Sequence, residues 1–265
     1  MQLELEKITQ AVCKLTQEVG AYIQAEAKAF TSSKVEIKSF NQLVSYVDKT
    51  AEKILVEGLM KIYPDAGFLT EEETINNEQK AYTWVIDPLD GTTNFIHQIP
   101  VYSISVALLH NTKPIVGVVF EMNKNETFYA WMNGGTYLNG TKIYVKQTSD
   151  LSETLVATGF PYYTFEKVQS YLQVLQELIQ KTRGVRRLGS AAVDLAYVAC
   201  GRFDGFFESS LSPWDVAAGI LLVKEAGGKV SAFDNNKNPI FDKELIAAST
   251  AIYPSFAAIV QSKLA

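Results

Sequence analysis

The sequence contains few of the residues that build disulfide frameworks or zinc sites. Its 265 residues include two cysteines, Cys13 and Cys200, and two histidines. Two cysteines are too few for a disulfide framework or a zinc cluster, and neither histidine has a partner at metal-ligand spacing. We therefore expect a reducing, cytoplasmic environment and interpret both cysteines as buried packing residues.

Long apolar runs and an excess of positive charge are also missing. No segment approaches the ~20 consecutive apolar residues that a membrane-spanning helix needs, and residues 1–7 do not resemble the start of a signal peptide. The formal net charge is −5, which disfavours general binding to nucleic acids or anionic membranes. With 16 Gly and 8 Pro, the chain is not of low complexity, and its length allows one large domain or two small ones.

The first half of the chain has the pattern of helices followed by strands. Residues 1–30 and 48–63 repeat apolar residues every three or four positions, as amphipathic helices do, and Asp48 is predicted to cap the second helix. Short β-rich runs follow at 82–86, 101–109, 115–120, 127–131 and 142–145. This half is predicted to be two helices packed on a mainly antiparallel sheet.

Strands and helices alternate in the second half. The predicted strands cover 154–158, 184–187, 205–208, 230–233 and 245–248. The predicted helices cover 164–181, 190–200 and 213–226, and a short helix closes the chain. We expect residues 1–148 to form an N-terminal α+β layer with most of the metal ligands and residues 149–265 to form a C-terminal α/β layer, packed together as one unit.

An acidic loop follows the predicted strand at 82–86. It reads Asp87-Pro88-Leu89-Asp90-Gly91-Thr92-Thr93-Asn94. Proline, glycine and hydroxyl residues directly after a strand are typical of a tight loop, in which Asp87 and Asp90 can face one point. Crowded carboxylates repel unless a cation lies between them, and oxygen ligands suit Mg²⁺, Ca²⁺ or Mn²⁺. Taken alone, the loop is also compatible with turns in which each Asp only accepts backbone hydrogen bonds.

Two further acidic features accompany this loop. Glu71, Glu72 and Glu73 follow a predicted strand at 67–69, and Asp215 opens a strongly apolar helix. Taken singly, the Glu run could be a solvated face and Asp215 could simply favour the helix dipole.

Together these segments resemble the inositol monophosphatase family of Mg²⁺-dependent phosphatases. Residues 87–95 match the first signature of the family without a break, and residues 213–219, continuing to 225–228, match the second. Element order and length fit over essentially the whole chain. The resemblance implies an α/β (α+β) fold, the layered αβαβα sandwich of the inositol monophosphatase and fructose-1,6-bisphosphatase type. It also implies a homodimer and a lithium-sensitive phosphatase.

The resemblance implies a set of metal ligands. Glu71, Asp87 and the carbonyl of Leu89 would bind a first Mg²⁺, and Asp87, Asp90 and Asp215 a second. Glu71 would also hold a third, weaker ion through water. Mn²⁺ is a possible substitute, whereas Li⁺ and Ca²⁺ are expected to inhibit.

The resemblance also implies the residues that act on water and phosphate. Thr92 and Asp48 would orient and deprotonate the attacking water, with Glu71 as a further catalytic residue, and the N–H groups of Gly91 and Thr92 would bind phosphate oxygens. Phosphoryl transfer requires mainly charge neutralisation and in-line positioning, so no protein nucleophile is needed.

Substrate contacts are implied from both halves of the chain. Glu208 would hydrogen-bond a ring hydroxyl, and the segment with Ser190 and Ala191 would contact inositol. Asp90, Gly91, Thr92 and Asp215 complete the predicted substrate contacts. The residues expected to support the site from behind are Glu72 and Lys38. A basic cluster at Arg183, Arg186 and Arg187 could serve a dimer contact or attract anionic substrates.

We predict hydrolysis of inositol 1-phosphate to inositol and phosphate. The alternatives within the family are fructose 1,6-bisphosphate, 3′-phosphoadenosine 5′-phosphate, NADP⁺ and histidinol phosphate. A third possibility is a regulatory binding protein of the transcription machinery, because some bacterial members associate with it. The complete set of carboxylates favours catalysis.

Overall fold

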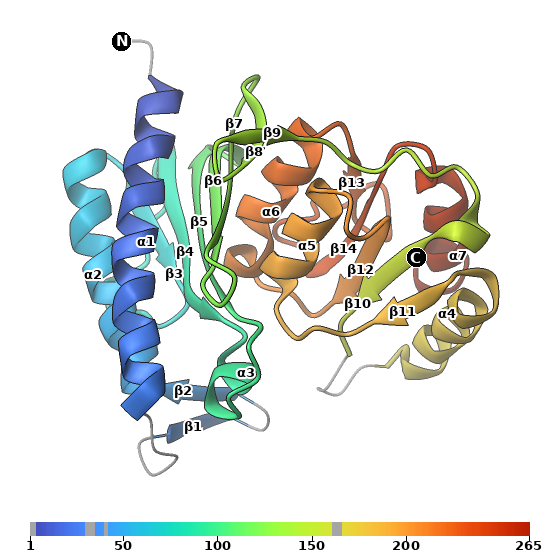
Figure 1. Ribbon diagram of the computed structural model, residues 1–265, viewed down its shortest axis with the longest axis horizontal. Coiled ribbons are helices and arrows are strands. Elements are labelled where there is room, and N and C mark those ends of the chain that lie inside the picture. Colours follow the sequence, from blue (N-terminus) through green and yellow to red (C-terminus); the bar gives the residue numbers. More distant parts are fainter. Residues whose placement is uncertain (1–3, 30–34, 40–41, 161–165) are drawn as a thin grey trace.

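The computed structural model describes residues 4–29, 35–39, 42–160 and 166–265, without the side chains of residues 29, 35–39 and 42–45. The helices are α1 (Leu5–Ala29), α2 (Tyr46–Ile62), α3 (Thr92–Ile96), α4 (Val168–Lys181), α5 (Ala191–Ala199), α6 (Pro213–Glu225) and α7 (Tyr253–Leu264), with a 3₁₀ turn at Leu151–Glu153. Helices and sheets alternate in five layers (Figure 1). The αβαβα sandwich predicted from the sequence is confirmed.

The first layer consists of α1 and α2, which pack on each other and on the first sheet (Figure 1). Their apolar faces bury Val12, Val19, Leu55 and Leu59 against that sheet. The amphipathic spacing therefore predicted both helices well. The predicted cap was wrong: α2 begins at Tyr46, so Asp48 lies inside its first turn, and the side chain of Asp48 is buried.

The second layer is a seven-stranded sheet in chain order. Its strands are β3 (Gly67–Thr70), β4 (Tyr82–Asp90), β5 (Ser103–His110), β6 (Lys113–Glu121), β7 (Glu126–Trp131), β8 (Gly135–Leu138) and β9 (Thr141–Ile143). All neighbours are antiparallel except β3 and β4, which run parallel. The sequence analysis missed β8 and the separate hairpin of β1 (Val35–Ser39) and β2 (Gln42–Ser45), because turn residues and polar residues break their patterns.

The fourth layer is a five-stranded sheet in the order β11-β10-β12-β14-β13. Its strands are β10 (Leu155–Thr158), β11 (Gly184–Arg186), β12 (Gly205–Ser209), β13 (Lys229–Ser231) and β14 (Glu244–Ala248). β10 runs parallel to β11 and β12, whereas β14 is antiparallel to its neighbours. Its outer face is covered by α4 and α7 (Figure 1). The chain passes between the sheets at 144–154, and the division at residue 148 stays a prediction.

The central layer, α5 and α6, is almost wholly apolar because both sheets cover it. Every residue of α5 is buried, as is the run Val216–Val223 of α6. The backbone of β6 approaches α6 so closely that a Cβ on Gly117 would lie 2.8 Å from the Ala218 carbonyl oxygen. This close packing fixes α6 against the first sheet.

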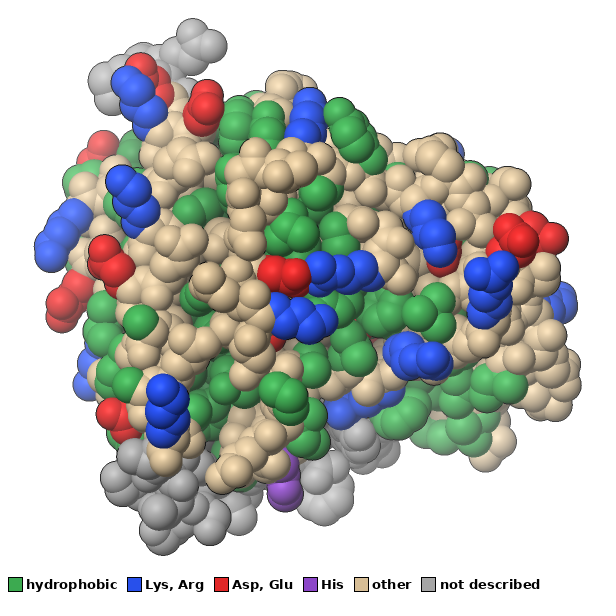
Figure 2. Space-filling view, viewed as in Figure 1, with side chains coloured by type: hydrophobic (Ala, Val, Ile, Leu, Met, Phe, Trp, Pro, Cys, Tyr) green, Lys and Arg blue, Asp and Glu red, His purple; other side chains and the backbone are tan. Residues whose placement is uncertain are grey.

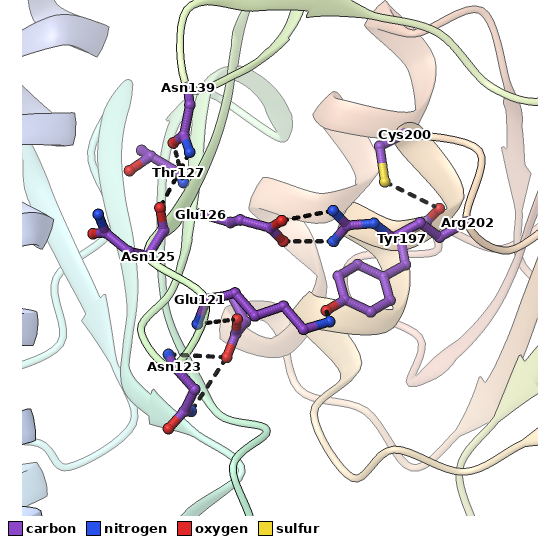
Figure 3. A network of polar contacts seen from close by, with 10 residues as sticks. Glu121, Asn123, Asn125, Glu126, Thr127, Asn139, Tyr197, Cys200 and Arg202 are labelled. Carbon is purple, nitrogen blue, oxygen red and sulfur yellow. Dashed lines mark hydrogen bonds and ion pairs between the residues drawn. The ribbon is translucent and has the colours of Figure 1, made fainter.

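A polar network ties the turn between β6 and β7 to α5 and the loop after it (Figure 3). The Glu126 carboxylate accepts hydrogen bonds of 2.5 and 2.6 Å from the two terminal nitrogens of Arg202. The guanidinium of Arg202 also lies over the ring of Tyr197. A bidentate ion pair of this kind holds direction as well as distance, so the two halves are joined by more than apolar packing.

The surface mixes charges of both signs. On the face drawn in Figure 2, basic and acidic side chains are interspersed and neither sign forms a broad patch. Among the described residues, no helix is both long and apolar enough to span a bilayer.

Candidate active site

Two parallel strands bring the first pair of acids together. Thr70 of β3 pairs with Ile86 of β4, and the N–H of Glu71 donates to the Ile86 carbonyl at 3.3 Å. Glu71 therefore follows beside Asp87, close enough for their carboxyl groups to share a hydrogen bond. The side chain of Asp87 is 2% exposed. Burial raises the pKa of Asp87 well above its usual value, and the nearby Glu71, Asp90 and Asp215 raise it further.

Asp90 ends β4 and reaches across to the C-terminal half. Its Oδ2 accepts hydrogen bonds from Ser190 Oγ at 2.6 Å and from the N–H of Ala192 at 2.8 Å. Burial raises the pKa of Asp90 to about 6, although these donors act in the opposite direction. Ser190 caps α5, so one serine orders both that helix and the carboxylate.

Asp215 enters from α6. Its Oδ2 accepts a 2.7 Å hydrogen bond from the N–H of Ser212, and Ser105 of β5 donates to the Trp214 carbonyl at 3.0 Å. The pKa of Asp215 is raised well above its usual value by burial and by the charge of Asp90. Asp215 of α6 thus interacts with Asp87 and Asp90 of β4, although the two segments lie far apart in the chain.

A hydroxyl and a carboxylate meet beside these acids. Thr92 Oγ1 lies 2.9 Å from Asp48 Oδ1 and 3.0 Å from the Leu89 carbonyl oxygen, so the hydroxyl can donate a hydrogen bond to either acceptor. Gly91, before the first turn of α3, has φ of 99°, and a Cβ there would press on Val101 and Gly189. Glycine is required at this position because side chains rarely adopt that conformation in so tight a space.

Glu52 is a structural support that the sequence analysis missed. It lies on α2 one turn after Asp48 and is fully buried. Its Oε2 accepts from the N–H of Glu72 at 2.7 Å, and its Oε1 accepts from the N–H and the hydroxyl of Thr74, both at 2.8 Å. Helix α2 therefore holds both Asp48 and the turn that carries Glu71. The i, i+4 spacing of two acids on an otherwise apolar helix face was the available signal.

Glu208 and Asp194 extend the acidic cluster on the side of the second sheet. Burial, followed by the charge of Asp90, raises the pKa of Glu208 to about 8, while Arg187 lowers it. Asp194, 1% exposed, has a pKa well above its usual value because of burial and of Glu208. Glu208 was predicted, but Asp194 was missed. A single acid within the apolar helix 191–199 was the signal for it.

The remaining predicted residues are Glu72, Ala191 and Lys38, and the two histidines were not assigned to the site. Glu72 is half-buried beside Glu71, and Ala191 is buried in the first turn of α5. Lys38 lies in β1, but its side chain is outside the described part of the chain. His97 and His110 are exposed, and the ring of His110 stacks on Tyr82.

The donors fit a divalent cation chemically. Carboxylate and carbonyl oxygens are the ligands that Mg²⁺ and Mn²⁺ prefer, and the mutual charge of Glu71, Asp87, Asp90 and Asp215 would be relieved by a cation. Within the described residues, no group of three or more His, Cys, Asp or Glu is spaced to hold an ion as it stands. Asp90 and Asp215 instead accept hydrogen bonds from protein groups. The coordination predicted from the sequence therefore stays a prediction.

The comparisons with known proteins agree over the whole chain. The profile of the inositol monophosphatase family matches residues 4–265. The chain is 40% identical over 228 residues to the Nus factor SuhB of Escherichia coli strain K12, covering 86% of this chain and 85% of the relative. It is 38% identical over 258 residues to the inositol-1-monophosphatase of Rhizobium meliloti strain 1021, covering 97% and 96%.

A solved structure has the same arrangement of elements. The extragenic suppressor protein suhB from Bartonella henselae matches with a TM-score of 0.90 at 34% identity, covering 97% of this chain and 100% of that one. The likeness of sequence and of fold therefore extends over both halves that contribute to the acidic cluster.

Proposed function

The chain belongs to the inositol monophosphatase family, and from this premise we propose that it hydrolyses inositol 1-phosphate to inositol and phosphate with Mg²⁺ as cofactor. Family membership implies phosphatase activity. The observation that carries the proposal is the convergence of Glu71, Asp87, Asp90 and Asp215 beside the hydrogen-bonded pair of Thr92 and Asp48.

In this proposal two Mg²⁺ ions would be held by Glu71, Asp87, Asp90, Asp215 and the Leu89 carbonyl, and Glu71 would take part in a third, weaker site. When bound, the ions supply positive charge to the phosphoryl oxygens and acidify water. Asp87 would contribute to both of these sites, because it interacts electrostatically with each of the other carboxylates. Mn²⁺ has the same preference for oxygen ligands and is expected to substitute.

The protein groups then position water and phosphate. The Thr92 hydroxyl, by donating to Asp48, leaves its oxygen lone pairs to accept a hydrogen bond from the attacking water. Asp48 is the acceptor of the proton that this water loses, passed through the threonine hydroxyl. The N–H groups of Gly91 and Thr92 at the start of α3 orient the phosphate oxygens.

The C-terminal half contributes substrate selectivity in this proposal. Glu208 contacts a ring hydroxyl of the polyol, and the backbone around Ser190 and Ala191 borders the ring. The same site could instead serve fructose 1,6-bisphosphate, 3′-phosphoadenosine 5′-phosphate, NADP⁺ or histidinol phosphate. We further propose that the protein is cytoplasmic and forms a homodimer. Size-exclusion chromatography with light scattering tests the homodimer directly.

A regulatory role is the second candidate. The E. coli relative is named a Nus factor, so association with the transcription machinery is an alternative use of the same fold. Asp87→Asn separates the two functions. If this variant lacks hydrolysis but returns cells that lack the gene to the wild-type phenotype, the regulatory role is the physiological one.

Phosphate release from a small panel tests the enzymatic proposal. We expect inositol 1-phosphate to be hydrolysed in Mg²⁺ in preference to fructose 1,6-bisphosphate, 3′-phosphoadenosine 5′-phosphate and NADP⁺. Millimolar Li⁺ is expected to inhibit, and Ca²⁺ is expected not to support turnover. Equal hydrolysis of the whole panel would contradict the proposed preference for inositol 1-phosphate. Phosphate release from none of the compounds would contradict the proposed phosphatase reaction.

A further inference from the structure

Gly159 lies directly beside the carboxylate of Glu208. β10 and β12 run parallel with Thr158 opposite Phe207, so the next pair along the two strands is Gly159 and Glu208. A Cβ built on Gly159 would lie 1.9 Å from both Cδ and Oε1 of Glu208. The Glu208 carboxylate therefore fills the space where a side chain of residue 159 would begin, and only a glycine leaves room for it.

The backbone of Gly159 is held from behind. The hydroxyl of Tyr171 on α4 donates to the Gly159 carbonyl at 2.8 Å and lies 3.0 Å from Thr158 Oγ1. The Tyr171 side chain is buried, and its ring packs against Phe207. Because this anchor keeps Gly159 from moving away, a side chain at position 159 would have to displace Glu208 instead.

Charged groups border the same carboxylate on the side of the site. Asp90 and Asp194 lie close enough to interact electrostatically with Glu208, and so does Arg187. The guanidinium of Arg187 also lies 5.9 Å from the ring centre of Phe160, the residue after Gly159. Charged groups on one side and backbone on the other restrict where the Glu208 carboxylate can go.

We propose that Gly159 is a positioning residue for substrate specificity: its missing side chain lets Glu208 lie against β10, where the carboxylate can meet a hydroxyl of a polyol phosphate. The inference rests on the proposed function, because it assigns Gly159 a role through the proposed contact of Glu208. The contact that Gly159 permits would distinguish phosphate esters of polyols from esters whose alcohol part has no further hydroxyl group.

The test is Gly159→Ala, assayed with inositol 1-phosphate and with 4-nitrophenyl phosphate, which lacks ring hydroxyls. The methyl group meets only the end of a flexible side chain, so the variant is expected to fold. Loss of the hydrogen bond between Glu208 and the ring hydroxyl should raise KM for inositol 1-phosphate by about tenfold, with kcat within about twofold. The constants for 4-nitrophenyl phosphate should not change. Gly184→Ala, in the neighbouring strand β11 and facing Arg186 and Leu155, is the matched control.

A double-mutant cycle separates the inference from the function on which it rests. Glu208→Ala should raise KM for inositol 1-phosphate, and Gly159→Ala should add nothing further in that background because there is no carboxylate left to displace. Glu208→Asp, which is one methylene shorter, should partly restore the Gly159→Ala variant.

Each contrary outcome has a separate meaning. If Glu208→Ala leaves KM unchanged, the proposed contact of Glu208 is wrong and the role of Gly159 falls with it. If Glu208→Ala raises KM but Gly159→Ala has no effect or a fully additive one, only the inference about Gly159 is overturned. An equal loss on both substrates would mean that Gly159 acts on the fold and not on specificity.

Discussion

The two sides of the candidate site are held in place in different ways. On the side of the first sheet, the acids and their supports are joined by direct hydrogen bonds, as between Glu52 and the turn at 72–74 and between Thr92 and Asp48. On the side of the second sheet, Glu208 is placed by close contact with Gly159 and by nearby charges.

This difference fits the two tasks that a phosphatase has. Phosphoryl transfer requires charge and water to be placed closely, and buried hydrogen bonds supply that rigidity. Substrate choice can be altered by moving one carboxylate. We therefore expect changes on the first side to abolish turnover and changes on the second side to alter preference.

The largest effect is expected from Asp90→Asn. The amide oxygen can still accept from Ser190 and Ala192, so the fold should persist, but the charge needed beside Asp87 and Asp215 is lost. We expect kcat to fall by about 10³-fold or more. Phosphate release is the measurement, with Asp242→Asn at the exposed surface as control. Near-native turnover in saturating Mg²⁺ would contradict the metal assignment.

Thr92→Ala should have a smaller effect, directed at the chemical step. The variant removes the hydroxyl that contacts Asp48 but keeps the backbone N–H groups of α3. We expect kcat to fall by about 10²-fold, with KM changed less than about threefold. Thr93→Ala, the exposed neighbour on the same helix, is the control. A rise in KM at constant kcat would assign Thr92 to substrate binding instead.

Glu52→Gln should act mainly on metal affinity. The Gln side chain has one acceptor oxygen where Glu52 uses two, so one end would point an amide N–H at the N–H of Glu72 or Thr74. The turn that carries Glu71 should loosen, and the variant should need about tenfold more Mg²⁺ for half-maximal rate, equivalent to about 1.4 kcal/mol.

Two readouts decide whether Glu52 acts through the metal site. Calorimetric titration with Mn²⁺ should show weaker binding by a similar factor, and kcat in saturating Mg²⁺ should recover. Glu57→Gln, exposed on the same helix, is the matched control. Unchanged Mn²⁺ binding together with a lower kcat would show that Glu52 does not act through the turn.

The helices and the acids of the two signatures could be predicted because local patterns carry them. The apolar spacing of α1 and α2 depends on burial of one face, and the acidic segment 87–94 is contiguous in the chain. The family resemblance then identified Asp215, which no local pattern connects to Asp87.

The supports of the site could not be predicted because they depend on tertiary pairing. Glu52 acts on a turn about 20 residues away, and Gly159 meets Glu208 only because β10 lies beside β12. The strand register that creates such contacts cannot be predicted from the sequence of either segment alone. Asp48 shows the limit of local patterns: its place at a helix start predicted a cap, and only the family resemblance predicted a place beside Thr92, whose Oγ1 lies 2.9 Å from Asp48 Oδ1.

The smallest effect is expected on stability and concerns both sides together. Folding raises the pKa of Asp90 from 3.8 to about 6 and that of Glu208 from 4.5 to about 8. At a pH between the unfolded and the folded pKa of each group, the folded protein keeps a proton that the unfolded chain has released. Raising the pH therefore favours the unfolded chain, and the metal-free protein should lose stability from about pH 5 to about pH 8.

Thermal melts in EDTA and in Mg²⁺ test this relation. Mg²⁺ binds the folded site and competes with its protons, so the rise in Tm on adding Mg²⁺ should be larger at about pH 8 than at about pH 5. Glu126 and Glu177, whose pKa values are lowered from 4.5, are mostly ionised in both states above about pH 5, so they oppose the trend only weakly. Glu208→Gln should remove the part of the fall in Tm in EDTA that comes from ionisation of Glu208. A Tm in EDTA that rises from about pH 5 to about pH 8 would mean that these acids are not forced together by the fold.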